Sequence, residues 1–486
     1  MRRRPLAFVV AVALVVLGLA YGFLRDSDPS ASPETLTTST TTFMAPQPLG
    51  TPGAAGVGDT YFPDLGNGGY DVGHYTLDLT WLADEGVLNG VTTIEATATQ
   101  DLSRFDLDLL GMDVRSITVD GRPAAFDRDQ RELVITPAHG IAEDAEFTTK
   151  ITYGGTPEAI TLGTDLFALG WQTHGREAFV VSEPAGAATF FPVNDHPSDK
   201  ATYTIRVTAP TDQTVAASGL LTAQDDIGHG TTSWTYEARD LMASYLVQIA
   251  IGDYELVDSP AADGVVIRHA FHRSQLEAGR LATAKTAAMV ELLAGVFGPY
   301  PFEVYGVLVV NAPLGFALET QTLTIIGQDI ASLGQGADVV LLHELAHQWF
   351  GNSVSVAGWD DIWLNEGFAT YAEWIYLERT GGQSSGELAR QAGELGSDLD
   401  LPPGDPGANE LFRTSVYLRG GMTLQALREA VGDDDFFEVL RTWAEDRAGG
   451  TGSTKQFIAL AEQVSNKDLA PLFDEWLYSD TLPSLD

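Results

Sequence analysis

The pattern of apolar residues changes along this 486-residue chain, and that change constrains the fold more than any other feature. Between residues 70 and 257, short runs such as 201–208 largely alternate apolar and polar residues between turn signals, as strands with one buried face do. In residues 276–293 the apolar residues recur at helical spacing instead. The sequence therefore predicts a multidomain protein with an all-β N-terminal domain followed by an α+β domain.

The second domain contains a His-Glu-x-x-His motif formed by His343, Glu344 and His347. Residues 338–350 around it lack Pro and Gly and have helical periodicity. Residues four apart share one helical face, so both imidazoles can bind the same metal ion. Catalytic zinc takes three protein ligands and leaves a position for water. Glu366, separated from His347 by eighteen residues and placed in a second predicted helix, is the expected third ligand.

This set of residues predicts a zinc hydrolase with one zinc ion per chain. Hydrolysis of a peptide bond requires an activated water, a polarised carbonyl, a donor for the oxyanion and a proton for the leaving amine. Zinc would supply the first two, and Glu344 would take a proton from the water and pass it to the amine. Asp360 and Asp361 are candidates to orient a ligand histidine. Capping of the helix that carries Glu366 is the favoured interpretation of these two aspartates.

The residues around Glu366, Trp-Leu-Asn-Glu-Gly-Phe-Ala, resemble the signature of the gluzincin zinc aminopeptidases, the family of aminopeptidase N and leukotriene hydrolase. The resemblance runs from about residue 60 to the C-terminus. It includes residues 416–421, which are similar to a Tyr-x-Lys-Gly segment, and residues 191–200, which are similar to Phe-Pro-x-x-Asp-x-Pro-x-x-Lys. It implies a β saddle followed by a thermolysin-like domain, in a short bacterial-like form without the C-terminal helical domain of many relatives.

The resemblance also implies four further functional residues. Tyr417 would donate a hydrogen bond to the oxyanion. Glu319 and Glu183 would bind the substrate's ammonium, because charge-assisted hydrogen bonds to an ammonium are the strong ones. Ala317 would line the substrate site. The function implied is an aminopeptidase that acts on peptides with a free N-terminus.

Several residues depart from the family pattern. Phe316, Leu318 and Thr320 stand where the family has Gly, Met and Asn, and Val181 stands where it has Gln. These departures leave the preferred side chain of the substrate open.

Two alternatives to an aminopeptidase remain. A zinc endopeptidase, or another zinc hydrolase on the same fold, would use the same metal centre, because that centre does not by itself select the substrate. Glu183 and Glu319 argue against this alternative. A catalytically inactive surface binding protein would be expected to have lost a metal ligand, the base or the tyrosine, and the sequence retains all of them.

Charge and cysteine content exclude other classes. With 67 acidic and 27 basic residues the net charge is −40, which argues against nucleic acid as a partner and favours a soluble, self-repelling surface. The chain has no cysteine, which excludes disulfides, thiolate zinc ligands and cysteine nucleophiles. The oligomeric state stays open.

The N-terminal residues predict a location outside the cytoplasm. Three arginines at residues 2–4 precede a 19-residue apolar run at residues 6–24, long enough to cross a bilayer. A retained membrane anchor is favoured over a cleaved signal peptide, because the run is followed by a poor cleavage site. The four expected segments are a signal anchor or signal peptide (1–25), a Ser/Thr/Pro-rich linker (26–60), a β-rich domain (61–257) and a thermolysin-like zinc peptidase domain (258–486).

Overall fold

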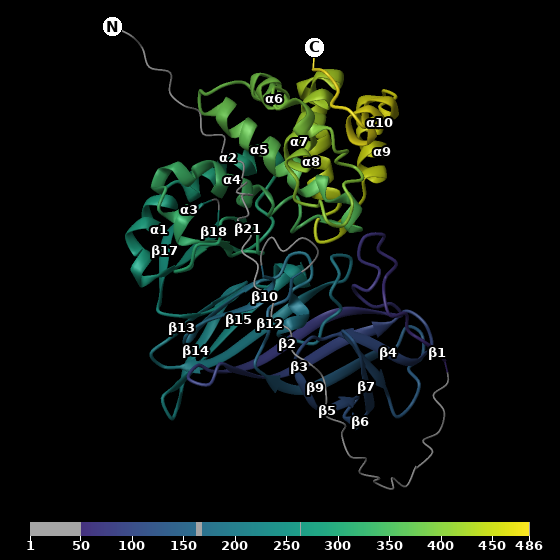
Figure 1. The fold of residues 1–486 in the computed structure, drawn as a ribbon, viewed down its shortest axis with the longest axis vertical. Helices are drawn as coiled ribbons and strands as arrows, with labels where there is room; N and C mark the ends of the chain where they lie inside the picture. Colours follow the sequence, from purple (N-terminus) through teal and green to yellow (C-terminus); the bar gives the residue numbers. More distant parts are fainter. Residues whose placement is uncertain (1–49, 162–167, 263, 486) are drawn as a thin grey trace, which may run out of the picture.

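The computed structural model describes residues 50–161, 168–262 and 264–485. The predicted membrane anchor and most of the predicted linker lie outside these residues. Figure 1 shows the strands of the N-terminal domain, coloured purple to teal, packed beneath the helices of the second domain, coloured green to yellow. None of the helices in the described ranges combines the length and the hydrophobicity that a membrane crossing requires.

The N-terminal domain is built on an eight-stranded sheet of order β14-β15-β12-β2-β3-β9-β5-β6. Burial alternates along its strands as the sequence predicts; Tyr75, Leu77 and Leu79 of β2 are buried, while Thr76 and Asp78 between them are partly exposed. The strands are β2 (Tyr70–Leu82), β3 (Val87–Ala98), β5 (Asp113–Val119), β6 (Arg122–Pro123), β9 (Glu146–Gly155), β12 (Lys200–Pro210), β14 (Leu220–Gly228) and β15 (Thr231–Ala243).

Two smaller sheets complete this domain. The first has the order β1-β4-β8-β7, with β1 (Thr51–Pro52), β4 (Leu102–Asp108), β7 (Ala125–Asp129) and β8 (Glu132–Thr136). The second has the order β10-β11-β16-β13, with β10 (Gly170–His174), β11 (Glu177–Val181), β13 (Thr214–Ala217) and β16 (Ile249–Gly252). The end of β11 leads directly to Glu183, one of the predicted site residues.

The second domain has a mixed sheet with helices packed around it. The sheet contains β17 (Tyr254–Ala262), β18 (Val265–His272), β20 (Val307–Val309), β22 (Thr324–Ile326) and β21 (Ala317–Leu318) in that order, with β19 (Val304–Tyr305) paired to β18. A two-stranded pair joins β23 (Ser355–Val356) to β24 (Thr451–Gly452). The helices are α1 (Leu276–Ala282), α2 (Thr286–Phe297), α3 (Gln328–Ala331), α4 (Asp338–Ala346), α5 (Trp363–Arg379), α6 (Ser385–Gly393), α7 (Thr414–Val431), α8 (Asp433–Asp446), α9 (Thr454–Ser465) and α10 (Ala470–Tyr478).

The chain passes from the sheets of the N-terminal domain to the sheet of the second domain near residue 253. Strand β16 ends at Gly252 and pairs with β11 and β13, whereas β17 begins at Tyr254 and pairs with β18. The alternation of apolar residues continues across this point, so the sequence pattern alone does not mark the change of sheet.

Residues 50–60, which the sequence analysis assigns to the linker, are packed on the folded domains. Strand β1 pairs with β4. Asp59 accepts a hydrogen bond from Trp359 N (2.8 Å) in the second domain and lies 3.1 Å from His196 Nε2 in the first. Tyr61, just after these residues, donates to Asp405 Oδ1 in the second domain (2.6 Å). This segment therefore connects the two domains.

Candidate metal centre and active site

Helix α4 and the turn after it present the two motif histidines to one point. The rings of His343 and His347 are buried and their centroids lie 4.8 Å apart. Their Nε2 atoms lie 3.3 and 3.4 Å from the same oxygen, Glu366 Oε2. Glu366 is in the first turn of α5, which packs against α4. The structure thus brings together the three zinc ligands that the sequence predicts.

The other ring nitrogens of the two histidines are already bonded. His343 Nδ1 lies 2.6 Å from Glu373 Oε1, and His347 Nδ1 lies 3.1 Å from the carbonyl oxygen of Phe350. With Nδ1 engaged in this way, each ring turns its Nε2 atom toward Glu366, which is the orientation that a metal ligand needs. Donor types and orientation therefore fit a zinc ion.

Glu373 is a functional residue that the sequence analysis missed. It lies seven residues after Glu366 on α5, a spacing that returns to the same helical face. Neither Asp360 nor Asp361 orients a ligand histidine, because Glu373 and the carbonyl of Phe350 occupy both Nδ1 positions. The favoured interpretation, capping of α5, is also wrong, because no side chain in the described ranges caps the N-terminus of that helix. Asp361 instead accepts a hydrogen bond from Thr454 N (2.8 Å) at the start of α9.

Helices α5 and α7 touch at their backbones beside the metal ligands. A Cβ atom on Gly367 would lie 2.8 Å from the carbonyl carbon of Gly420, so only glycine permits this approach. The contact places Tyr417 of α7 beside the centre, with its ring stacked on that of His343 at a centroid distance of 5.8 Å.

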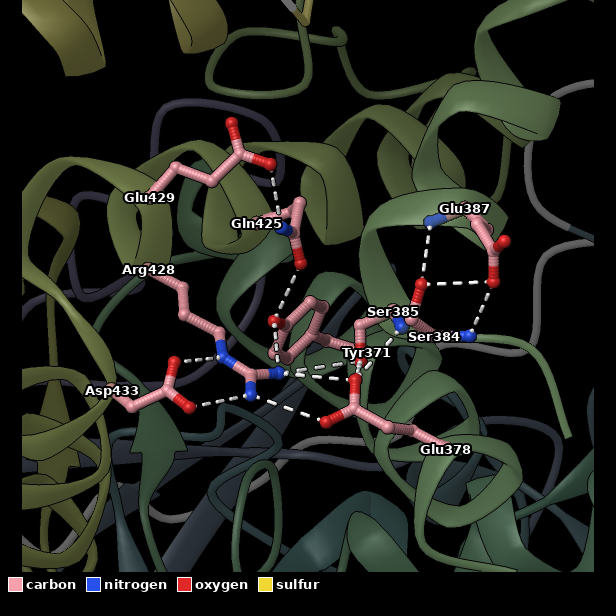
Figure 2. A network of polar contacts seen from close by, with 9 residues as sticks. All are labelled: Tyr371, Glu378, Ser384, Ser385, Glu387, Gln425, Arg428, Glu429 and Asp433. Carbon is pink, nitrogen blue, oxygen red and sulfur yellow. Dashed lines mark hydrogen bonds and ion pairs between the residues drawn. The ribbon is translucent and has the colours of Figure 1, made fainter. Parts of the chain in front are cut away.

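A polar network, shown in Figure 2, ties the distal ends of the same two helices together. Arg428 of α7 bonds Glu378 of α5 (3.2 Å) and Asp433 of α8 (2.8 Å). Tyr371 of α5 donates to Gln425 of α7 (2.8 Å). The network joins α5 to α6, α7 and α8 and holds these four helices in one arrangement.

The two predicted amine-binding residues converge on the metal centre from different domains. Glu183 follows β11 of the N-terminal domain, and Glu319 follows β21, the edge strand of the second domain's sheet. Carboxylate oxygens of Glu183, Glu319 and Glu366 all lie within 4.8 Å of one another. Each of Glu183 and Glu319 is 3% exposed, and the Oε1 atom of each has no hydrogen-bond partner in the described part of the chain.

The remaining predicted residues line the same region. Ala317 is half-buried on β21 and pairs with Ile326 of β22. Leu318 and Val181, two of the departures from the family pattern, are buried together in one small apolar cluster.

Burial and mutual repulsion shift the pKa values of the carboxyl groups. Burial raises the pKa of Glu344 to about 8, although the charges of His343 and His347 oppose the shift. Burial, followed by the charges of Glu319 and Glu366, raises the pKa of Glu183 well above its usual value. Burial also acts on Glu366, but the two imidazoles prevail and lower its pKa to about 2.

The tyrosine at the centre keeps its proton. Burial and the neighbouring carboxylates, Glu366 first among them, raise the pKa of Tyr417 well above its usual value. Its hydroxyl is therefore a hydrogen-bond donor throughout the neutral range.

Comparison with known proteins agrees with this geometry. Residues 72–246 match the peptidase M1 N-terminal domain, and residues 284–476 match the peptidase family M1 domain. An M1 zinc metallopeptidase from Deinococcus radiodurans is 35% identical, with a TM-score of 0.83 over 88% of this chain and 98% of that one. The chain belongs to peptidase family M1. The predicted family and the predicted two-domain fold class are confirmed.

Other members of family M1 define how far the likeness extends. Aminopeptidase M1 of Arabidopsis thaliana is 27% identical over 315 residues, which are 60% of this chain and 36% of that protein. The chain spans less than half the length of the curated relatives that it matches. A two-domain M1 zinc metallopeptidase carrying a glutamate-to-alanine mutation was solved with bound L-tryptophan, and this chain covers 99% of it at 34% identity and a TM-score of 0.83.

Proposed function

We propose that this chain is a zinc aminopeptidase that hydrolyses the first peptide bond of peptides with a free N-terminus. The observation that carries the proposal is the position of Glu183 and Glu319 within 4.8 Å of Glu366, which is also a member of the metal-binding group. A site for one ammonium thus adjoins a site for one metal ion. With its ammonium at Glu183 and Glu319, a peptide would present its first carbonyl group to the metal ion.

The names of relatives support this proposal. Curated members of the family that match the chain are named aminopeptidases. A glutamate-to-alanine mutant of the Deinococcus radiodurans enzyme was solved with a Tyr-Ser-Ala substrate, and this chain covers 99% of it at 34% identity. We infer that this chain also cleaves peptides, because it has its own metal-binding residues and the two glutamates beside them.

His343, His347 and Glu366 would hold one zinc ion, which supplies Lewis acidity toward the scissile carbonyl and toward the attacking water. Glu344, the neighbour of His343 in the motif, takes a proton from that water and delivers it to the leaving amine. Tyr417 donates its hydroxyl proton to the oxyanion as negative charge develops there.

The buried carboxylates of Glu183 and Glu319 bind the substrate's ammonium. Neither carboxylate has a full set of partners within the described part of the chain, so a cation with several N–H donors satisfies both. Fixing the amine also fixes the first carbonyl relative to the metal centre, and such positioning reduces the entropy that the reaction must otherwise lose. An acetylated N-terminus lacks the charge and is excluded.

The test compares one peptide with free and acetylated N-termini. We expect residues to be released one at a time from the free peptide and no cleavage of the acetylated one, with both results dependent on zinc. Equal cleavage of the two peptides at one internal bond would instead establish an endopeptidase. Zinc binding without hydrolysis of any peptide would favour a catalytically inactive binding protein.

We also propose that the enzyme acts outside the cytoplasm, held to the membrane by the apolar run at residues 6–24. Support comes from the three arginines before this run and from its length. Fractionation of cells producing the full chain tests the proposal. Recovery of the protein from the medium with a new N-terminus after residue 20 would indicate secretion and cleavage.

A further inference from the structure

The predicted amine site is assembled from two domains, so its geometry depends on how the domains meet. Glu183 belongs to the N-terminal domain and Glu319 to the second. Their carboxylates can share one ammonium only while the segments that carry them keep a fixed relative position. Buried polar side chains at the interface fix that position.

Lys200, the first residue of β12 in the N-terminal domain, reaches into the second domain. Its Nζ donates to the carbonyl oxygens of Asn352 (2.8 Å), Ser353 (2.8 Å) and Gly450 (3.3 Å). The residue is 7% exposed, and burial lowers the pKa of its ammonium to about 7. Burying an ammonium is costly unless hydrogen bonds replace its hydration. The three carbonyl oxygens replace part of that hydration, so Lys200 fixes the position of the backbone that carries them.

The contact continues from Asn352 to Glu319. Asn352 Nδ2 donates to the backbone carbonyl oxygen of Glu319 (2.6 Å), and Gln348 Nε2 donates to the same oxygen (3.0 Å). Asn352 is fully buried, and Gln348 accepts a further hydrogen bond from Thr322 N (2.9 Å). Two amides from the end of the metal-binding helix thus fix the backbone of Glu319.

A second buried side chain connects the strand before Glu183 to the residue after Glu319. Gln248 Nε2 donates to the carbonyl oxygen of Val180 (3.1 Å) and lies 3.4 Å from Thr320 Oγ1. The two glutamates are therefore aligned across the domain boundary from both sides.

We propose that Lys200 and Asn352 are positioning residues that hold Glu319 where it can share the substrate's ammonium with Glu183. Lys200 acts through the backbone of Asn352, and Asn352 acts through the backbone of Glu319. Neither side chain touches the substrate. This inference rests on the proposed function, because it assigns a purpose to the amine site.

Two variants of the full chain test the inference. Lys200→Met removes the ammonium and retains much of the side-chain volume. Asn352→Ala removes the amide donor but keeps the backbone carbonyl that Lys200 contacts, so it tests the second link even if Lys200→Met does not fold. Lys285→Met is the matched control, because Lys285 is half-exposed and pairs with Asp338 at the other end of the metal-binding helix.

The measurement is the affinity of each zinc-loaded variant for two inhibitors that share a hydroxamate. Leucine hydroxamate carries the α-ammonium, and 4-methylpentanoyl hydroxamate is the same molecule without it. We expect Lys200→Met and Asn352→Ala to weaken the binding of leucine hydroxamate about tenfold or more. Binding of the analogue should change less than about twofold, with zinc content unaltered. Lys285→Met should change neither affinity.

A merely structural role gives a different result. If a variant binds both inhibitors more weakly by the same factor, or binds both as tightly as the parent does, the positioning role is refuted. If the parent enzyme binds the two inhibitors equally, Glu183 and Glu319 do not bind an ammonium. That result would refute the proposed function and not only the positioning role.

Discussion

Replacement of Glu373 by alanine should weaken zinc binding although Glu373 does not contact the metal-binding atoms. Its Oε1 lies 2.6 Å from His343 Nδ1, and both side chains are largely buried, at 18% and 9% exposure. The carboxylate holds the imidazole in the orientation that presents Nε2 to the centre. Without it, the ring can rotate and its Nδ1–H loses a partner.

The magnitude follows from the kind of contact that is lost. Removing a hydrogen-bonded partner of a metal-ligating histidine costs about 10- to 100-fold in metal affinity. Each factor of ten corresponds to about 1.4 kcal/mol, so the loss is about 1.4–2.8 kcal/mol. Glu373→Gln keeps an acceptor oxygen but loses the charge, and we expect its loss of zinc affinity to lie near the lower end of that range.

Zinc affinity is measured by competition with a chelator of known affinity, and zinc content by elemental analysis. Asp361→Asn is the matched control, since Asp361 bonds Thr454 N and leaves the histidines untouched. The control should bind zinc like the parent. If Glu373→Ala bound zinc as tightly as the parent, orientation of His343 by Glu373 would be refuted as a source of affinity.

Four further results are expected. Glu344→Gln should retain zinc and lose about 10²- to 10⁴-fold in kcat, measured by single-turnover kinetics beside metal analysis. Tyr417→Phe should lower kcat with little change in KM, because its donor acts on charge present only in the transition state. Gly367→Ala should lower the Tm, since overpacking costs about 1–3 kcal/mol, whereas Gly295→Ala, with open space around its Cβ position, should not. Burial would raise the pKa of Asp59, but its hydrogen bonds lower it to about 2. Asp59→Asn should therefore destabilise the protein above about pH 4, with a deficit in denaturant titrations that shrinks as the pH falls from about 4 to about 2.

The metal ligands could be predicted from sequence because their arrangement is mostly local. His343 and His347 are one helical turn apart, and Glu366 follows within a short, recognisable context. The geometry of the histidine pair depends on helix periodicity alone. Glu373 is marked only by its spacing of seven residues from Glu366, which places both on one face of the helix. That spacing shows which way Glu373 faces but not that a histidine of α4 lies there, because the contact depends on how α4 and α5 pack.

Contacts between distant segments account for the rest of what the sequence did not reveal. Lys200 and Asn352 are 152 residues apart, and their contact exists only because the two domains meet. Residues 50–60 have the composition of a linker, yet Asp59 bonds both domains, through His196 in the first and Trp359 in the second. Hydrophobic periodicity does not report polar contacts of this kind, so composition favoured a linker where the structure has an ordered segment.

The electrostatics of the site explain why a free amine should select the substrate. Glu183, Glu319, Glu344 and Glu366 are all buried in one region, and their repulsion raises the pKa of Glu183 further than burial alone does. A metal ion held by the histidines and Glu366 would offset only part of that negative charge. The carboxylates of Glu183 and Glu319 still need a cation, and a peptide's ammonium brings one together with the bond to be cleaved. With a neutral N-terminus, each buried carboxyl group must either take up a proton or stay charged without a partner, and in both cases the charge-assisted hydrogen bonds to the ammonium are lost. Exclusion of blocked peptides thus follows from the charge of these carboxylates, while the position of Glu319 decides which bond is reached.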